Sequence, residues 1–233
     1  MFNKLLCLLS LYLPVYYFCN IYKPNNTKRT IWDTFTRVIS TINAIDCINM
    51  TFHSLLNWDN YFDLHFTANE YQIDMLFWFC SYLFIDGIFQ IPDIFKSFNL
   101  NLFSSIIHHF VGGFGIYLIA NTKMGFFLGF YFSMTEISTP FLNLSWFIKN
   151  KYLFLTFYGL FMISRILTSP LLLIYLRINE EKIIELVPLQ YFMVYYATLT
   201  LILLNFVWFL FLTKKLLKYW NFLDLIRNKI FKK

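Results

Sequence analysis

Two adjacent histidines and one glutamate are the side chains of this chain best suited to chemistry, because they interrupt otherwise apolar sequence. His108, His109 and Glu136 lie within residues 101–148, a stretch rich in Phe, Leu and Ile. An ionisable side chain at the centre of a membrane costs about 3 kcal/mol even on lenient insertion scales. We therefore expect all three to face a protein interior or a wet cavity.

The two imidazoles are predicted to differ in role, because neighbouring residues of a helix point about 100° apart. His108 lies on the polar face of its stretch, whereas His109 lies nearer the edge of that face. A neutral imidazole accepts a proton from a lipid hydroxyl or amine, or is itself acylated, and a nearby carboxylate sets its tautomer. We expect His108 to be the better base or nucleophile. The alternative is that both histidines only form hydrogen bonds between helices.

Glu136 has two interpretations. As a functional group it would orient His108 or hold a polar headgroup. As a structural group it would pair with Arg165, since opposite charges in a bundle interior attract each other strongly. Asp86 has the same alternatives, with Arg37 as its candidate partner. Two further polar side chains, predicted to form hydrogen bonds between helices, are Tyr82 and Asn205.

The composition is that of a polytopic membrane protein. Hydrophobic residues make up 58% of the 233 residues, charged residues only 14%, and the mean hydropathy is +0.56. The net charge of +6 comes from basic residues at the ends of apolar stretches and in the C-terminal tail. This placement indicates topology and excludes nucleic-acid binding. The four cysteines lack metal-ligand or disulfide spacing, so we predict no metal site and no cofactor.

Apolar stretches of about 20 residues, the length that a helix needs to cross a bilayer, predict an all-α protein with about seven transmembrane helices. The first, residues 5–22, is expected to be a retained anchor, because no cleavage site of small residues follows it. The other six expected spans are residues 31–52, 73–92, 101–121, 125–148, 152–176 and 190–212.

The charges of the connecting segments predict an orientation. Residues 59–70 and 180–185 are acidic, whereas residues 23–30, 149–151 and the tail are basic. Because Lys and Arg favour the cytosolic side, we expect a lumenal N-terminus and a cytosolic C-terminus.

Each of the last six expected spans carries polar or small residues at helical spacing, which in a bilayer marks the face turned toward other helices. We predict that these faces line one shared cavity that opens to the bilayer. Its expected polar lining is Arg37, Tyr82, Asp86, His108, Glu136, Arg165 and Asn205.

These residues also carry a family resemblance. The run Arg37-Val38-Ile39-Ser40, the pair His108-His109 and the segment Glu136-Ile137-Ser138-Thr139-Pro140, each in a separate span, are similar to the TLC domain of the TRAM, LAG1 and CLN8 proteins. The resemblance divides the chain into an N-terminal anchor with a cytosolic loop (1–29), a TLC domain (30–213) and a basic cytosolic tail (214–233).

The resemblance implies that the last six helices form a barrel that holds a lipid or acyl chain, in the endoplasmic reticulum or another endomembrane. In the ceramide synthase branch of the family, the double histidine is catalytic. This chain departs from that branch after the histidines, because Phe132-Ser133-Met134-Thr135-Glu136 stands where the synthases have a signature with two spaced aspartates.

Two functions follow as hypotheses. The first, which we favour, is a lipid-handling protein that acts in membrane lipid homeostasis, with membrane lipids as its partners. The alternative is a membrane acyltransferase, with acyl-CoA as co-substrate and His108, His109 and Glu136 as catalytic residues. The sequence predicts no oligomeric state.

Overall fold

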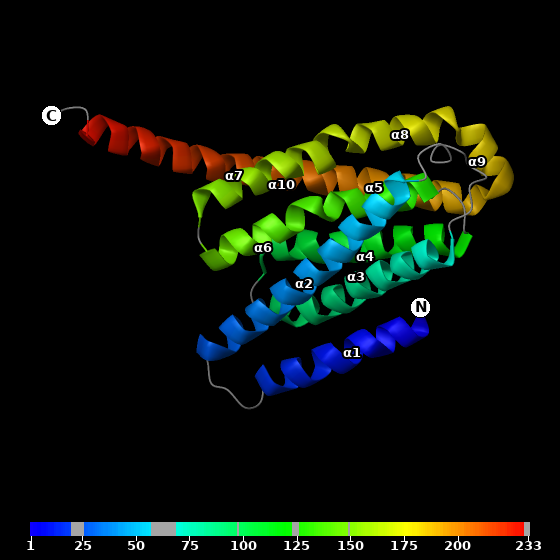
Figure 1. Cartoon of the computed structure of the whole chain (residues 1–233), viewed down its shortest axis with the longest axis horizontal. Coiled ribbons are helices and arrows are strands. Elements are labelled where there is room, and N and C mark those ends of the chain that lie inside the picture. The colour runs from blue at the N-terminus through cyan, green and yellow to red at the C-terminus, as the bar shows by residue number, and fades with distance from the viewer. Residues whose placement is uncertain (20–25, 57–68, 97, 123–125, 149, 231–233) are drawn as a thin grey trace.

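The fold is almost entirely helical over the residues that the computed structural model describes: 1–19, 26–56, 69–96, 98–122, 126–148 and 150–230. The described helices form seven successive passes that alternate in direction (Figure 1). In order, they are α1 (Phe2–Tyr17); α2 (Asn26–Leu55); α3 (Glu70–Lys96); α4 (Leu100–Thr122); α5 (Phe126–Met134) with η3 (Thr135–Ser138) and α6 (Thr139–Ile148); α7 (Lys151–Phe161) with η4 (Met162–Leu167) and α8 (Ser169–Ile178); and α10 (Pro188–Ile230). The short α9 (Glu180–Leu186) precedes α10.

Four of the described stretches are long and apolar enough to cross a membrane: Glu70–Phe95, Leu100–Thr122, Lys151–Ile178 and Pro188–Lys218. They correspond to four of the expected spans and confirm a multi-pass membrane protein. The other three passes are shorter, more charged or interrupted. The described part of α1 has 16 residues, α2 carries Asp33, Arg37 and Asp46, and η3 divides the pass from α5 to α6. The count of seven spans stays a prediction.

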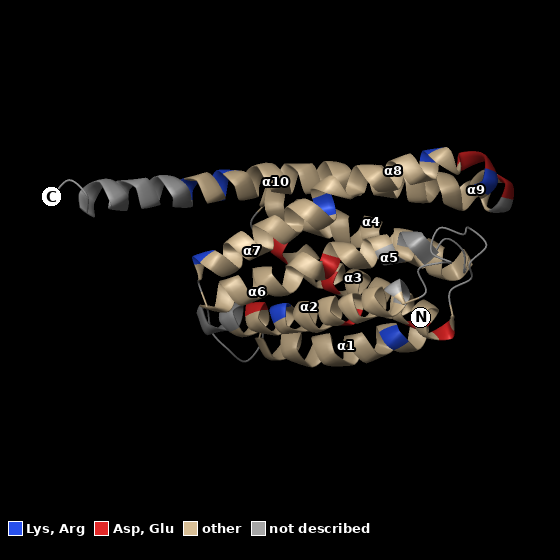
Figure 2. Cartoon of the chain, turned by 45° about the horizontal axis from the view of Figure 1, so that its top comes forward, with Lys and Arg blue, Asp and Glu red and all other residues tan. Residues whose placement is uncertain are grey.

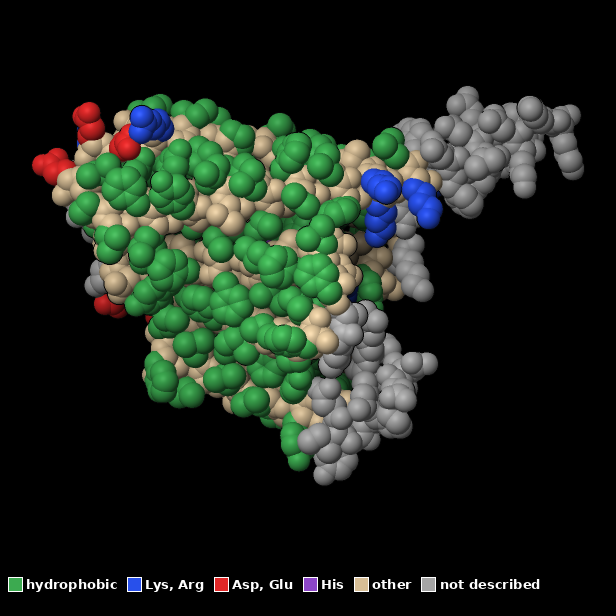
Figure 3. Space-filling model, turned by 180° about the vertical axis from the view of Figure 1, so that it is seen from behind, with side chains coloured by type: hydrophobic (Ala, Val, Ile, Leu, Met, Phe, Trp, Pro, Cys, Tyr) green, Lys and Arg blue, Asp and Glu red, His purple; other side chains and the backbone are tan. Residues whose placement is uncertain are grey.

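The surface supports this assignment. On the face shown in Figure 3, hydrophobic side chains cover the middle of the bundle and charged side chains lie near its two ends. Large apolar side chains remain exposed on these helices, for example Leu155, Leu171 and Phe206. Acidic residues gather on α9 at one end, and basic residues lie on α10 where it leaves the bundle at the other (Figure 2). An apolar belt between charged ends is what contact with lipid requires. The expected acidic residues 59–63 lie outside the described residues.

The last six passes follow one another in a cycle of contacts. α2 packs on α3, α3 on α4, α4 on α10, α10 on η4 and α8, η4 on η3, and α6 back on α2. This is the neighbour order that a barrel needs, although the six-helix barrel itself stays a prediction. α1 lies outside the cycle and packs mainly against α3.

α3 and α4 approach closely at Gly87. A Cβ atom added there would lie 3.1 Å from the Cβ of His109 and 3.4 Å from the ring of Phe110. Small residues allow helices in membranes to pack this closely, where no hydrophobic force from water drives them together. Gly87 therefore fixes how near His109 lies to α3.

We predict that Gly87→Ala lowers the melting temperature of the detergent-purified protein, with a cost of about 1–3 kcal/mol from overpacking. Gly159→Ala is the matched control, because nothing lies within 4 Å of a Cβ added there. That control should keep or slightly raise the melting temperature, since Ala favours a helix over Gly. Equal losses in the two variants would contradict the close approach at Gly87.

Candidate functional site

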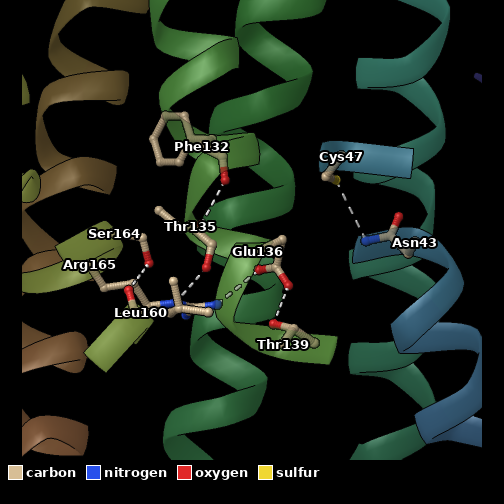
Figure 4. A network of polar contacts seen from close by, with 9 residues as sticks. All are labelled: Asn43, Cys47, Phe132, Thr135, Glu136, Thr139, Leu160, Ser164 and Arg165. Carbon is tan, nitrogen blue, oxygen red and sulfur yellow. Dashed lines mark hydrogen bonds and ion pairs between the residues drawn. The ribbon is translucent and has the colours of Figure 1, made fainter. Parts of the chain in front are cut away.

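The ion pair between Arg165 and Glu136 is buried where two interrupted passes meet (Figure 4). Arg165 Nη2 donates to Glu136 Oε1 at 3.0 Å, and Arg165 Nε donates to the backbone carbonyl of Thr135 at 2.9 Å. The other carboxylate oxygen accepts from the Thr139 hydroxyl at 2.7 Å. Both charged residues are only 6% exposed. Each charge is thus neutralised, which a buried position demands.

The segment η3 frees the carbonyl that Arg165 uses. Pro140 has no N–H to give to the carbonyl of Glu136, four residues earlier. That carbonyl accepts instead from the N–H of Thr139, in the tighter pattern of a 3₁₀-helix. The N–H of Thr139 is therefore not available to the carbonyl of Thr135. That carbonyl accepts from Arg165 Nε instead.

The segment η4 is a short π-helix that carries Arg165. Pro170, which follows it, has no N–H for the carbonyl four residues before it. The hydroxyls of Ser164, Thr168 and Ser169 donate to carbonyls of the preceding turn, and such back-bonding bends helices. Prolines and hydroxyl groups thus account for both irregular segments, which meet at the ion pair.

A cavity of about 690 Å³ lies beside this ion pair. Its lining comes from α2, α3, α4, η3, α6, α7, η4 and α10. Among the polar lining residues are Arg37, Tyr82, His108, His109, Glu136 and Arg165. Residues from all six of these passes therefore line one large cavity.

A narrow second cavity, of about 20 Å³, shares Leu83, His108 and Glu136 with the large one. Its other walls are mostly apolar: Phe79, Ile116, Phe132, Leu201 and Ile202. Three buried polar atoms on residues that line it have no hydrogen-bond partner among the described residues: His108 Nδ1, Thr198 Oγ1 and Asn205 Oδ1. Buried polar atoms are normally paired, so these are available to a polar group of a ligand or to water.

A third cavity, of about 740 Å³, shares Arg37, Leu142 and Lys215 with the large one. Lys151 and Trp146 also line it, and the described lining contains no Asp or Glu. Arg37 lies 4.6 Å from the Trp146 ring, and Lys215 and Lys151 are exposed. The large and third cavities therefore adjoin at their shared residues. We call the basic part of their lining, Arg37, Lys151 and Lys215, the basic mouth; it lies at the end of the bundle where α7 begins.

The two histidines have different surroundings. His109 Nδ1 lies 3.3 Å from the carbonyl oxygen of Leu83 and 3.5 Å from Asp86 Oδ2. Because both oxygens are acceptors in these contacts, the neutral ring carries its proton on Nδ1 and keeps a lone pair on Nε2. His108 instead packs its ring 5.0 Å from that of Trp208. The imidazole supported by a carboxylate is thus His109.

The TLC-domain model of the TRAM, LAG1 and CLN8 proteins matches residues 26–214, which include every residue named above as lining the three cavities except Lys215. The chain belongs to the TLC-domain family. No curated protein and no solved structure matches it. The match begins four residues before the expected start of the TLC domain and ends one residue after its expected end.

The structure brings most of the expected residues of the TLC domain together. Arg37, Tyr82, His108, His109, Glu136 and Arg165 line the large cavity, while Asn205 lines the narrow one. Asp86 lines neither and reaches the site only through His109.

The structure distinguishes between the alternatives for Asp86 and for Glu136. Arg37 donates to Asn143 Oδ1 at 3.1 Å, and Asp86 accepts from residues of α1 and α3, so the two do not pair with each other. Of the two alternatives for Glu136, the structure shows the ion pair with Arg165. The sequence left both sets of alternatives open because the spacing within each helix does not reveal which helices are neighbours.

Sequence reasoning missed two contributors. Tyr12 of α1, before the TLC domain, contacts Asp86, and Lys215 of α10, just after it, lines two cavities. A buried tyrosine in an apolar anchor carries no distinctive signal in one sequence. The positive charge of Lys215 is typical of the tail, residues 214–233, that the sequence predicts. Among the described residues, no group of three His, Cys, Asp or Glu side chains could hold a metal ion.

We predict that Arg165→Met and Glu136→Leu each destabilise the protein by about 3–5 kcal/mol, because each leaves one buried charge unpaired. The double variant should recover most of the loss, since an apolar pair often replaces a buried ion pair at little cost. The measurement is unfolding in detergent by SDS titration. A double variant as unstable as the sum of the singles would show that the two side chains do not act as a pair.

Proposed function

We propose that this TLC-domain protein binds an amphipathic membrane lipid in its interior and so acts in membrane lipid homeostasis. The observation that carries the proposal is the mixed lining of the large cavity, which has polar side chains at Arg37, His108 and Glu136 and apolar ones at Leu142, Phe157 and Phe211. A lipid has the same two parts. The proposal places its headgroup against the polar side chains of this cavity and its chain against the apolar ones.

The narrow cavity adjoins the large one at the residues that they share. In the narrow cavity, Thr198, Leu201, Ile202 and Asn205 lie on one face of α10, because their spacing is that of a helix. This cavity, of about 20 Å³, has room for a water molecule or a small polar group and not for an acyl chain, which the proposal places in the large cavity. The unpaired atoms of His108 and Asn205 suit a hydroxyl or amide near the start of that chain.

The basic mouth favours a headgroup with negative charge. Arg37, Lys151 and Lys215 come from three different passes and line the connected space. The described lining supplies only one carboxylate, that of Glu136, which Arg165 already neutralises. An anionic headgroup would therefore be attracted by the exposed charges of Lys151 and Lys215.

The alternative proposal is acyl transfer from acyl-CoA, favoured by the contact between Asp86 and His109. His109 Nε2 would take the proton of a lipid hydroxyl or amine as that group attacks the thioester carbonyl. The C–S bond would then break and CoA would leave as the thiol after protonation. Asp86 would hold the imidazole, as a carboxylate does for a general base. In this alternative His109 is the better base, with His108 beside it and Glu136 occupied by Arg165.

We predict that the protein purifies with bound lipid, detected by native mass spectrometry. Ser105→Leu, which places a larger side chain in the large cavity, should lower lipid occupancy roughly tenfold, the effect of about 1.4 kcal/mol of lost binding energy. Gly159→Leu is the matched control, because the space around that glycine is open. A wild-type protein without lipid, or equal occupancy in both variants, would contradict lipid binding in this cavity. Incubation with labelled acyl-CoA tests the alternative, which requires a labelled acyl-lipid product.

The proposal includes a location in the endoplasmic reticulum or another endomembrane, with a lumenal N-terminus and a cytosolic C-terminus. The basis for the orientation is the charge at the two ends of one pass. Its start at α7 is basic and α9 at its other end is acidic, and basic residues favour the cytosolic side.

We predict that Asn150→Cys reacts with a membrane-impermeant maleimide in intact microsomes and that Glu181→Cys reacts only after permeabilisation. Both positions are exposed. The background lacks the native Cys7, Cys19, Cys47 and Cys80. Labelling of both from the same side would rule out this topology.

A further inference from the structure

Helix α1 reaches the interior of the bundle through one tyrosine. Tyr12 is fully buried, and its hydroxyl donates to Asp86 Oδ1 at 2.9 Å. The residues one turn to either side, Leu8 and Tyr16, pack against the same core. Tyr12 lies before residues 26–214, so the TLC-domain match does not include it.

Asp86 is held by donors on two helices. Tyr12 of α1 donates to Oδ1, and Gln90 of α3 donates to Oδ2 at 2.6 Å. The same Oδ2 atom lies 3.5 Å from Nδ1 of His109 on α4. Donors on both oxygens fix the rotation of a carboxylate, so Tyr12 and Gln90 together determine where Oδ2 faces. The contacts thus link α1 to the imidazole that lines the large cavity.

We propose that Tyr12 is a positioning residue: through Asp86, it holds His109 in the tautomer with its proton on Nδ1 and its Nε2 lone pair free. α1 is then part of the site and not only a membrane anchor. The inference does not rest on lipid binding, because the state of the ring is measurable in a protein without ligand.

A packing role for Tyr12 is the competing explanation. Its ring contacts those of Trp32, Phe35 and Phe89, with centroids 5.1 to 6.0 Å apart. Tyr12→Phe keeps the ring and removes only the hydroxyl. A packing role would therefore leave His109 unchanged in this variant, whereas a positioning role would not.

The test is nitrogen NMR of the full chain with ¹⁵N-labelled histidine, in lipid nanodiscs. The His109 signals are assigned by their loss in His109→Gln. In the wild type we expect a single signal pair of the tautomer protonated on Nδ1. In Tyr12→Phe and in Asp86→Asn we expect loss of that single state, with signals of the Nε2-protonated tautomer appearing.

The double variant decides whether Tyr12 acts through Asp86. On the Asp86→Asn background, Tyr12→Phe should cause no further change at His109. The His108 signals serve as the internal control and should keep their positions in Tyr12→Phe. Unchanged His109 signals in Tyr12→Phe would overturn the proposal, as would an additional change in the double variant. Unchanged signals in Asp86→Asn would also overturn it and would leave the Leu83 carbonyl as the group that sets the tautomer.

Discussion

The burial of Arg165 is the constraint from which the rest of the site follows. A guanidinium inside an apolar bundle needs hydrogen-bond acceptors for its N–H groups, because burial removes its hydration. The chain provides them from the neighbouring pass, as the Glu136 carboxylate and the freed carbonyl of Thr135. Both passes are irregular at this point: η3 carries Glu136 and η4 carries Arg165. In the described residues from α5 to α8, these are the only two segments that are not α-helical, and the ion pair joins them. The large cavity lies beside these two irregular segments, both of which contribute to its lining.

The other buried polar groups follow the same rule of finding partners across passes. Asn143 of α6 exchanges hydrogen bonds with Arg37 and Thr41 of α2, and Trp208 of α10 donates to Ser104 of α4. In a bilayer, apolar surface alone does not select which helices meet, because lipid is as apolar as the helices. These specific contacts therefore help to select the neighbours of each helix. The atoms left unpaired at His108 and Asn205 lie together on the narrow cavity.

The sequence predicted the helices well and the contacts less well. Apolar length and terminal charge are local properties, so the expected spans from 73–92 to 190–212 match α3 to α10 within a few residues at most ends. The exception is the end of α10, which continues to Ile230. The pair of Glu136 and Arg165 was foreseeable as one of two alternatives, because both lie mid-span with opposite charge. The partners of Asp86 were not, since they depend on α1 packing beside α3 and on rotations that one sequence does not encode visibly.

The central claim is that the space beside Arg165 and Glu136 holds a lipid. Cryo-electron microscopy of the protein in lipid nanodiscs tests it most directly, at a resolution that shows acyl chains. The account predicts continuous elongated density within the large cavity, from the basic mouth at Lys215, past the ion pair, to His108. An interior closed by side chains, with lipid density only on the outer surface of the bundle, would contradict it.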